Sequence, residues 1–352
     1  MNQNLEKILE KVDAILISSP ANIIYLTNYS GFSETERECI LILTKKSNFL
    51  ITDKRYSEAL KKQTKNFIVK DEGIYKFLKD EAKALFNKLN IKTIGFEEND
   101  LRVSEFKAFK KIVNLKPVDL TNLRIIKTNE EIENIKLACK ISDQALNYIL
   151  EKIRLGISEK EVANLIESYI KERNGEASFK TIVAFGKNSA IPHHQTSNIK
   201  LTKNQIVLLD FGVKINNYCS DMTRTIYFGK APEKFKMIHR TVLTAQTEAI
   251  RKIKQNTNAS IIDKAAREYI ISQKYPSIPH SVGHGIGVEV HETPFISPNS
   301  KNIIKNNMVF SVEPGIYFSD YGGVRIEDLV LVKNGLAELI SHSNREIIEL
   351  PC

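Results

Sequence analysis

Residues 205–227 read QIVLLDFGVKINNYCSDMTRTIY, and this stretch predicts two β-strands joined by a turn at Asn216 and Asn217. Consecutive asparagines suit the positive φ angles of a two-residue hairpin loop. A loop of those two residues sets Asp210 opposite position 223, which makes Asp221 the diagonal neighbour of Asp210 on the same face. A turn centred one residue earlier sets the two aspartates directly opposite. In both registers the two carboxylates lie on one side of a hairpin.

Asp210 ends the apolar run IVLL, which is typical of a buried strand. Two neighbouring buried carboxylates repel each other and cost several kcal/mol unless a cation compensates them. A metal ion is one such cation. The structural alternative is that one aspartate caps a turn while the other pairs with Arg224. The hairpin alone favours neither interpretation over the other.

A second pair of acids lies in residues 308–332, MVFSVEPGIYFSDYGGVRIEDLVLV. Glu313 and Glu327 are symmetric about position 320, so a hairpin with its turn there sets them face to face. Arg325 lies two residues before Glu327 and therefore on the same face of its strand. The structural alternative is a salt bridge between Arg325 and one glutamate, with the other glutamate exposed.

Five of the seven histidines, which are His193, His194, His280, His284 and His291, fall in the strand-rich stretches of the second domain, and histidine is a common metal ligand and proton carrier. Residues 280–292 read HSVGHGIGVEVHE. The glycines beside His284 predict that the backbone there approaches a ligand closely.

The first third of the chain alternates strands, expected at residues 14–17, 38–43, 48–52 and 91–96, with helices, expected at 56–62, 74–89 and 103–112. This alternation favours an α/β domain with a mixed or parallel sheet. Two capping boxes, Thr128 with Glu131 and Ser158 with Glu161, predict helices that end at Gly156 and near residue 175. Further helices are expected at about 232–254 and 260–272. We place the domain boundary near residue 122, and no internal sequence repeat stands out.

The chain has 352 residues, of which 42% are hydrophobic and 26% charged, and this composition predicts a globular protein of about two domains. Its net charge of +9 comes from lysines interleaved with glutamates, so we expect a solvated surface and no nucleic-acid partner. No apolar run reaches membrane-spanning length, and the N-terminus lacks an apolar signal region, so we expect a cytoplasmic location. The four scattered cysteines predict free thiols.

Together, the two acid pairs, the HSVGHGIGVEVHE stretch, Glu313 followed by Pro-Gly, and Arg325-Ile-Glu327-Asp resemble the creatinase/aminopeptidase P/methionine aminopeptidase family, known as the pita-bread fold. The resemblance implies an α+β chain: residues 1–122 as a smaller α/β creatinase-type N-terminal domain and 123–352 as a pita-bread catalytic domain. It assigns five metal ligands, which are Asp210, Asp221, His284, Glu313 and Glu327. It also gives catalytic roles to Glu313, His193, His280, His291 and Arg325, with His194 beside His193 as a competing choice.

The five ligands carry a charge of −4, which two divalent cations balance. Oxygen-rich ligation favours Mn²⁺, with Co²⁺ or Zn²⁺ able to substitute. Such a pair can activate a bridging water, and Glu313 is the candidate that orients this water and carries its proton. His291 and His193 are expected to hydrogen-bond the scissile carbonyl, His280 to shape the pocket, and Arg325 to orient Glu327 or an aspartate.

The N-terminal domain indicates the proline-specific branch of the family, because methionine aminopeptidases resemble only the second half of the chain. We therefore expect a metallo-exopeptidase that acts on short peptides with proline in second position. Xaa-Pro aminopeptidase is the favoured activity and Xaa-Pro dipeptidase (prolidase) the alternative. By the same resemblance the chain forms a homodimer. A non-enzymatic binding scaffold is the hypothesis from another class of protein.

Overall fold

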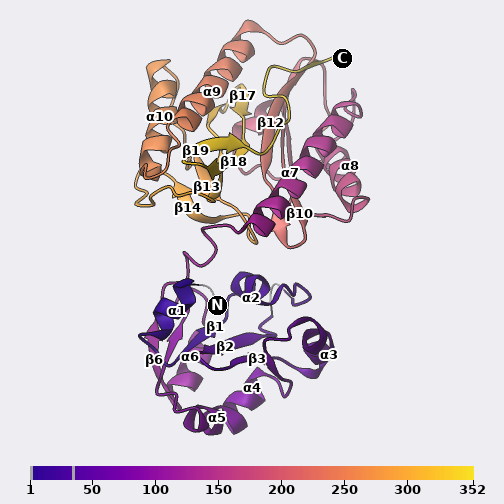
Figure 1. Cartoon of the computed structure of the whole chain (residues 1–352). Helices are drawn as coiled ribbons and strands as arrows, with labels where there is room; N and C mark the ends of the chain where they lie inside the picture. Colours follow the sequence, from indigo (N-terminus) through magenta and orange to yellow (C-terminus); the bar gives the residue numbers. More distant parts are fainter. Residues whose placement is uncertain (1–2, 34–35) are drawn as a thin grey trace. The chain divides into compact units, whose positions relative to one another are not determined.

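The structure is a computed structural model that describes residues 3–33 and 36–352 (Figure 1). The chain divides into two compact units, residues 1–124 and 125–352. Each helix of the described residues is too short or too polar to traverse a lipid bilayer.

The N-terminal unit is built on a six-stranded mixed sheet with the order β4-β3-β2-β1-β5-β6. Strand β1 pairs antiparallel with β2 and parallel with β5, so the mixed sheet predicted from the sequence is confirmed. The strands are β1 (Ala14–Ile17), β2 (Ile40–Thr44), β3 (Asn48–Ile51), β4 (Ile68–Lys70), β5 (Thr93–Phe96) and β6 (Asn114–Pro117).

Both faces of this sheet are covered. Ala14 and Leu16 of β1 belong to one apolar cluster, whereas Ile15 and Ile17 belong to a second one, as the two-residue period of a strand requires. The helices of the unit are α1 (Gln3–Leu9), α2 (Pro20–Thr27), α3 (Lys54–Gln63), α4 (Ile74–Lys76), a π-helical segment (Phe77–Glu81), α5 (Ala82–Lys88) and α6 (Val103–Lys110). The sequence did not predict α1 or α2.

The second unit consists of two helix pairs around small sheets. Figure 1 shows α7 (Asn129–Leu150) and α8 (Glu159–Lys171) on one side of the strands and α9 (Glu233–Arg251) and α10 (Ala259–Ser272) on the other. Both predicted capping boxes are present, at Thr128 and at Ser158. Helix α7 ends at Leu150, earlier than expected, and Gly156 adopts a φ of 80° in the turn that follows.

The strands of the second unit form four sheets. The four-stranded sheet has the order β20-β12-β9-β8 and the five-stranded sheet the order β14-β13-β15-β18-β19. The strands are β7 (Glu176–Ala177), β8 (Ile182–Phe185), β9 (Gln205–Phe211), β10 (Val213–Ile215), β11 (Tyr218–Cys219), β12 (Met222–Phe228), β13 (Gly283–Gly285), β14 (Glu292–Ile296), β15 (Val309–Val312), β16 (Gly315–Phe318), β17 (Gly322–Arg325), β18 (Asp328–Lys333), β19 (Leu336–Leu339) and β20 (Glu349–Leu350). A short 3-10 helix spans Gly186–Ala190.

The two helix pairs repeat each other, which the sequence did not reveal. The N-caps of α8 and α10 are Ser158 and Asn258. Two residues before each cap lies a residue with positive φ, Gly156 and Asn256, and the backbone N–H of each donates to a carbonyl of a later loop, that of Leu201 or of Ile304 respectively. The second unit therefore repeats the same helix start at a spacing of about 100 residues.

Candidate metal centre

The register of both predicted hairpins is confirmed. Asn216 and Asn217 have φ values of 49° and 68°, and Asp210 of β9 lies opposite Thr223 of β12. In the second hairpin Val312 pairs with Asp328 and Gly315 with Arg325, so the register between them brings Glu313 and Glu327 face to face. Each hairpin thus presents two carboxylates to one side, as the alternation of side chains predicts.

The five expected ligands line a single pocket of about 420 Å³. One ligand atom each from Asp221, His284 and Glu327 lie within 4.8 Å of one another. Nε2 of His284 also lies 3.4 Å from Oε1 of Glu313 and 3.6 Å from Oδ2 of Asp221. The pocket is lined by Phe179, Lys180, Ile182, Pro192, His193, Asp210, Asp221, His280, Ser281, His284, Val290, His291, Phe295, Glu313, Arg325 and Glu327.

The orientation of His284 suits a metal ligand. Its Nδ1 donates to the carbonyl of Gly285 at 3.1 Å, which leaves the lone pair of Nε2 directed at the carboxylates. The flanking glycines do not serve the purpose expected from the sequence. A Cβ on Gly283 would lie 1.9 Å from the carbonyl oxygen of Ser311, and one on Gly285 would lie 2.3 Å from that of Thr293. The glycines therefore allow neighbouring strands, and not a ligand, to approach the backbone of β13.

Three buried carboxylate oxygens in the pocket have no hydrogen-bond partner in the described part of the chain: Oδ1 of Asp210, Oδ1 of Asp221 and Oε1 of Glu327. A buried carboxylate oxygen without a partner costs free energy, so native proteins rarely keep one without a bound ion or water. Three such oxygens beside one imidazole fit a site for divalent cations, because those ions accept carboxylate and imidazole ligands together.

The pKa values of the acids also indicate that the nearby positive charges do not fully compensate these carboxylates. Burial raises the pKa of Asp221 and of Glu327 well above the usual carboxyl range, and the negative charges of the neighbouring acids raise both further. Burial also raises the pKa of Glu313, although the charges of His280 and Arg325 oppose that rise. Without a cation the cluster takes up protons, and a bound cation replaces them.

Arg325 connects the two acid pairs. Its Nη2 donates to Oδ2 of Asp210 at 2.6 Å, and its Nε donates to Oγ1 of Thr223 at 3.0 Å. Thr223 in turn donates to Oε2 of Glu327 at 2.8 Å. Of the partners expected for Arg325, the aspartate is therefore bound directly and Glu327 through one hydroxyl.

The other four histidines of the strand-rich stretches separate into two groups. His193, His280 and His291 line the pocket, whereas Nε2 of His194 donates to the buried carboxylate of Glu159 at 2.9 Å. Of the two adjacent histidines, only His193 lines the pocket. Burial lowers the pKa of His291 to about 4, so the ring is neutral at physiological pH. Burial also lowers the pKa of His280.

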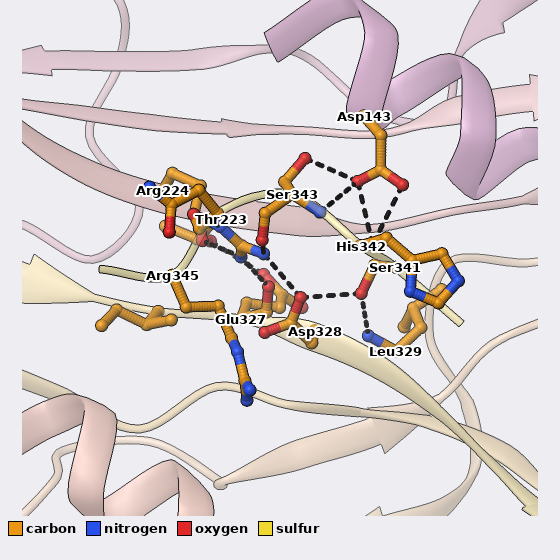
Figure 2. A network of polar contacts seen from close by, with 12 residues as sticks. Asp143, Thr223, Arg224, Glu327, Asp328, Leu329, Ser341, His342, Ser343 and Arg345 are labelled. Carbon is orange, nitrogen blue, oxygen red and sulfur yellow. Dashed lines mark hydrogen bonds and ion pairs between the residues drawn. The ribbon is translucent and has the colours of Figure 1, made fainter. Parts of the chain in front are cut away.

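Arg224 forms hydrogen bonds with both Glu327 and Asp328 (Figure 2). Nη1 of Arg224 donates to the carbonyl of Glu327, and its Nη2 donates to Oδ1 of Asp328 at 2.6 Å. Ser341 donates to the same carboxylate oxygen at 2.8 Å, and Asp143 of α7 accepts the backbone N–H groups of residues 342 and 343. The alternative of an Arg224 partner among the paired aspartates is therefore wrong, because the guanidinium is committed to Asp328.

Sequence reasoning missed three residues of the site. The hydroxyl of Tyr317 contacts Nε2 of His280 at 2.9 Å and accepts from Arg325 at 3.1 Å. Thr223 bridges Arg325 and Glu327, and its place opposite Asp210 was the only signal for it. Lys180 lies at the pocket wall with an exposed side chain, and nothing in its local sequence marks it.

Comparison with known proteins agrees with this geometry. Residues 133–334 match the model of metallopeptidase family M24, and residues 3–127 match the creatinase/prolidase N-terminal domain. The fold and the site define a metal-dependent peptidase. The chain belongs to metallopeptidase family M24, as the resemblance of its motifs implied.

Full-length relatives support the proline-specific branch of this family. The chain is 36% identical over 368 residues to the Xaa-Pro dipeptidase of Pyrococcus furiosus, covering 99% of this chain and 100% of that protein. It is similar to the solved structure of an Xaa-Pro dipeptidase from Bacillus anthracis, with 35% identity, a TM-score of 0.92 and coverage of 99% and 98% of the two chains. The X-Pro aminopeptidase of Thermotoga maritima gives 34% identity, a TM-score of 0.89 and coverage of 98% and 99%. These similarities confirm the expected pita-bread architecture.

Proposed function

We propose that this chain is an Xaa-Pro dipeptidase that binds two divalent cations through Asp210, Asp221, His284, Glu313 and Glu327. The convergence of these five side chains in one pocket, with three carboxylate oxygens lacking partners among the described residues, is the observation that carries the proposal. A binding scaffold would have no reason to keep such oxygens buried, because each costs stability without a bound ion.

The dipeptidase activity replaces the aminopeptidase activity that the sequence favoured. Relatives that match over nearly their whole length are named Xaa-Pro dipeptidase, although one similar structure is an X-Pro aminopeptidase. A dipeptidase must also recognise the carboxylate at the end of its substrate. The ammonium of Lys180 has no ion-pair partner in the described ranges 3–33 and 36–352, so this pocket lysine is free to bind that carboxylate.

The chemistry divides between the cations and the side chains. Bound divalent cations supply Lewis-acid polarisation and a water of lowered pKa, with Mn²⁺ as the preferred ion and Co²⁺ or Zn²⁺ as substitutes. Glu313 accepts the proton of the attacking water, because its carboxylate lines the pocket beside His284. His193 and His291 donate hydrogen bonds to the scissile carbonyl, and Arg325 holds the carboxylate of Asp210 in place through a hydrogen bond of 2.6 Å.

The experiment compares hydrolysis of Xaa-Pro dipeptides and Xaa-Pro-Yaa tripeptides by the protein loaded with Mn²⁺, Co²⁺ or Zn²⁺. We expect a higher kcat/KM for the dipeptides. Folded, metal-loaded protein that hydrolyses neither substrate contradicts the proposal, and a preference for tripeptides supports the aminopeptidase instead. Light scattering on the same sample tests the homodimer, which is part of the proposal by family resemblance.

Lys180 allows a sharper test of the dipeptide preference. Lys180→Met should raise KM for Xaa-Pro dipeptides about tenfold, the value of one charge-assisted hydrogen bond, while tripeptide KM changes little. Lys180→Arg is the matched control, because it keeps the charge. Equal changes in KM for dipeptides and tripeptides would show that Lys180 does not bind the substrate carboxylate.

A further inference from the structure

Three buried carboxylates outside the metal cluster lie beside the three pocket histidines. Glu159, Asp263 and Glu292 have exposed fractions of 0%, 1% and 6%. Burying a carboxylate costs several kcal/mol unless it is fully paired, so each must form compensating contacts. Each carboxylate is bonded, directly or through one basic side chain, to the stretch of chain that carries one of these histidines.

Glu159, the first residue of α8, holds the segment that carries His193. Its Oε2 accepts from Nε2 of His194 at 2.9 Å and from the backbone N–H of Ser197 at 2.9 Å. Its Oε1 accepts from the backbone N–H of Phe185 and from the side-chain amide of Asn188. The carboxylate is therefore bonded to both ends of the loop from which His193 reaches the pocket wall.

Asp263 of α10 holds the segment that carries His280 through Arg267. The two side chains form a bidentate pair with both N···O distances at 2.8 Å. Arg267 then donates to the carbonyl of His280 at 3.0 Å and to that of Ile278, while Asp263 accepts from the backbone N–H of Val282 at 3.3 Å. The backbone on both sides of His280 is bound to this one pair.

Glu292 holds the segment that ends in His291. Its carboxylate pairs with Nζ of Lys127 at 3.0 Å, and both side chains are buried, with exposed fractions of 4% and 1%. The same carboxylate accepts from the backbone N–H of Glu289 at 3.1 Å. A Cβ on Gly287 would lie 2.7 Å from it, so the loop between β13 and β14 packs directly on this charge.

We propose that Glu159, the Asp263–Arg267 pair and the Glu292–Lys127 pair are positioning residues that set the places of His193, His280 and His291 respectively. The inference rests on the proposed peptidase activity. None of the three carboxylates is among the five expected metal ligands, so the proposal assigns them to the histidines and not to cation binding. Misplacing a catalytic group by about 1 Å can cost about 100-fold in rate, which makes such anchors valuable.

The test is a double-mutant cycle for each pair, measured as kcat/KM on an Xaa-Pro dipeptide with the full metal-loaded chain. Glu159→Gln, Arg267→Met and Lys127→Met should each lower kcat/KM by about 10–100-fold in the wild-type background. In the backgrounds His193→Ala, His280→Ala and His291→Ala respectively, the same substitutions should cost less than about threefold, because the group they position is gone. An equal loss in both backgrounds, or no loss in the wild type, overturns the assignment for that pair.

Two further measurements separate positioning from general damage. Metal stoichiometry and affinity should stay as in the wild type, and imidazole NMR signals should shift chiefly for the histidine that the substituted residue holds. Arg251→Met is the matched control, since Arg251 also pairs with an acid on its own helix, Glu248, but is exposed. If Lys127→Met does not fold, Glu292→Gln tests the same anchor. An inactive wild type would refute the proposed function instead, and the NMR shifts would still test the positioning.

Discussion

The two halves of the second unit, α7 to β12 and α9 to β18, begin their second helices in the same way but differ in what supports their acids. Each half places two carboxylates on a hairpin, Asp210 with Asp221 and Glu313 with Glu327. Only the second half adds an imidazole, that of His284, to the cluster.

In each half an arginine forms an ion pair with an acidic residue of the other half. Arg325 of the second half binds Asp210 of the first, and Arg224 of the first half binds Asp328 of the second. Both guanidinium groups and both acids are nearly or fully buried. Both halves thus carry an acidic hairpin, and the reciprocal arginine pairs fix one hairpin against the other.

The largest effect on activity is expected from replacing one acidic metal ligand in each half with its amide. Asp221→Asn and Glu327→Gln should each lower kcat/KM by about 1000-fold or more, because bound cations supply several kcal/mol of transition-state stabilisation. Elemental analysis and kinetics on Xaa-Pro dipeptides measure the loss. Asp320→Asn, in the exposed turn of the second hairpin, is the control and should retain activity. Full activity of either variant would remove that residue from the ligand set.

The crossing pairs should dominate stability. Arg224→Met should lower the free energy of unfolding by about 3 kcal/mol, because it leaves the buried carboxylate of Asp328 without its guanidinium partner. Urea denaturation measures this change. Arg251→Met, which removes an exposed ion pair, should change it by less than about 0.5 kcal/mol. Equal stability of these two variants would show that the crossing pair does not hold the halves together.

Metal affinity should rise with pH. The folded-state pKa values of Asp221, Glu313 and Glu327 are raised, so their contribution to the stability of the metal-free protein is present below the unfolded pKa of about 4 and is lost as pH rises through the folded values. Cations must displace these protons, so affinity should increase up to about tenfold per pH unit for each proton released. Calorimetry between pH 5.5 and 8 in buffers of different ionisation enthalpy counts the protons. A flat profile without proton release contradicts the raised pKa values.

The smallest effect concerns the repeated helix starts. Gly156→Ala should destabilise the protein by about 1 kcal/mol, because alanine disfavours the left-handed φ of 80° at this position. Asn256→Gly at the equivalent site should be close to neutral, since glycine adopts a φ of 70° without strain. Thermal or urea unfolding compares the two. A larger loss for Asn256→Gly would mean that its side chain, and not its backbone conformation, matters.

Much of the fold follows from local sequence. The paired asparagines at 216 and 217 set the register of the first hairpin, and the capping boxes at Thr128 and Ser158 set two helix starts. The repeated helix start could not be predicted from the sequence, because its two copies share backbone conformation more than residue type, as Gly156 and Asn256 illustrate.

The sequence alone indicates the two acidic hairpins, because turn chemistry and strand alternation act over a few neighbouring residues. The resemblance of its motifs implied the family and, with it, the α+β architecture. Three further features depend on the tertiary fold: His193 and not His194 faces the pocket, Arg325 binds Asp210, and Lys127 binds Glu292. The hydrogen bonds concerned, His194 to Glu159, Arg325 to Asp210 and Lys127 to Glu292, join residues 35 to 165 positions apart. The free energy of burying a charge selects such partners in space, and no local pattern along the chain encodes it.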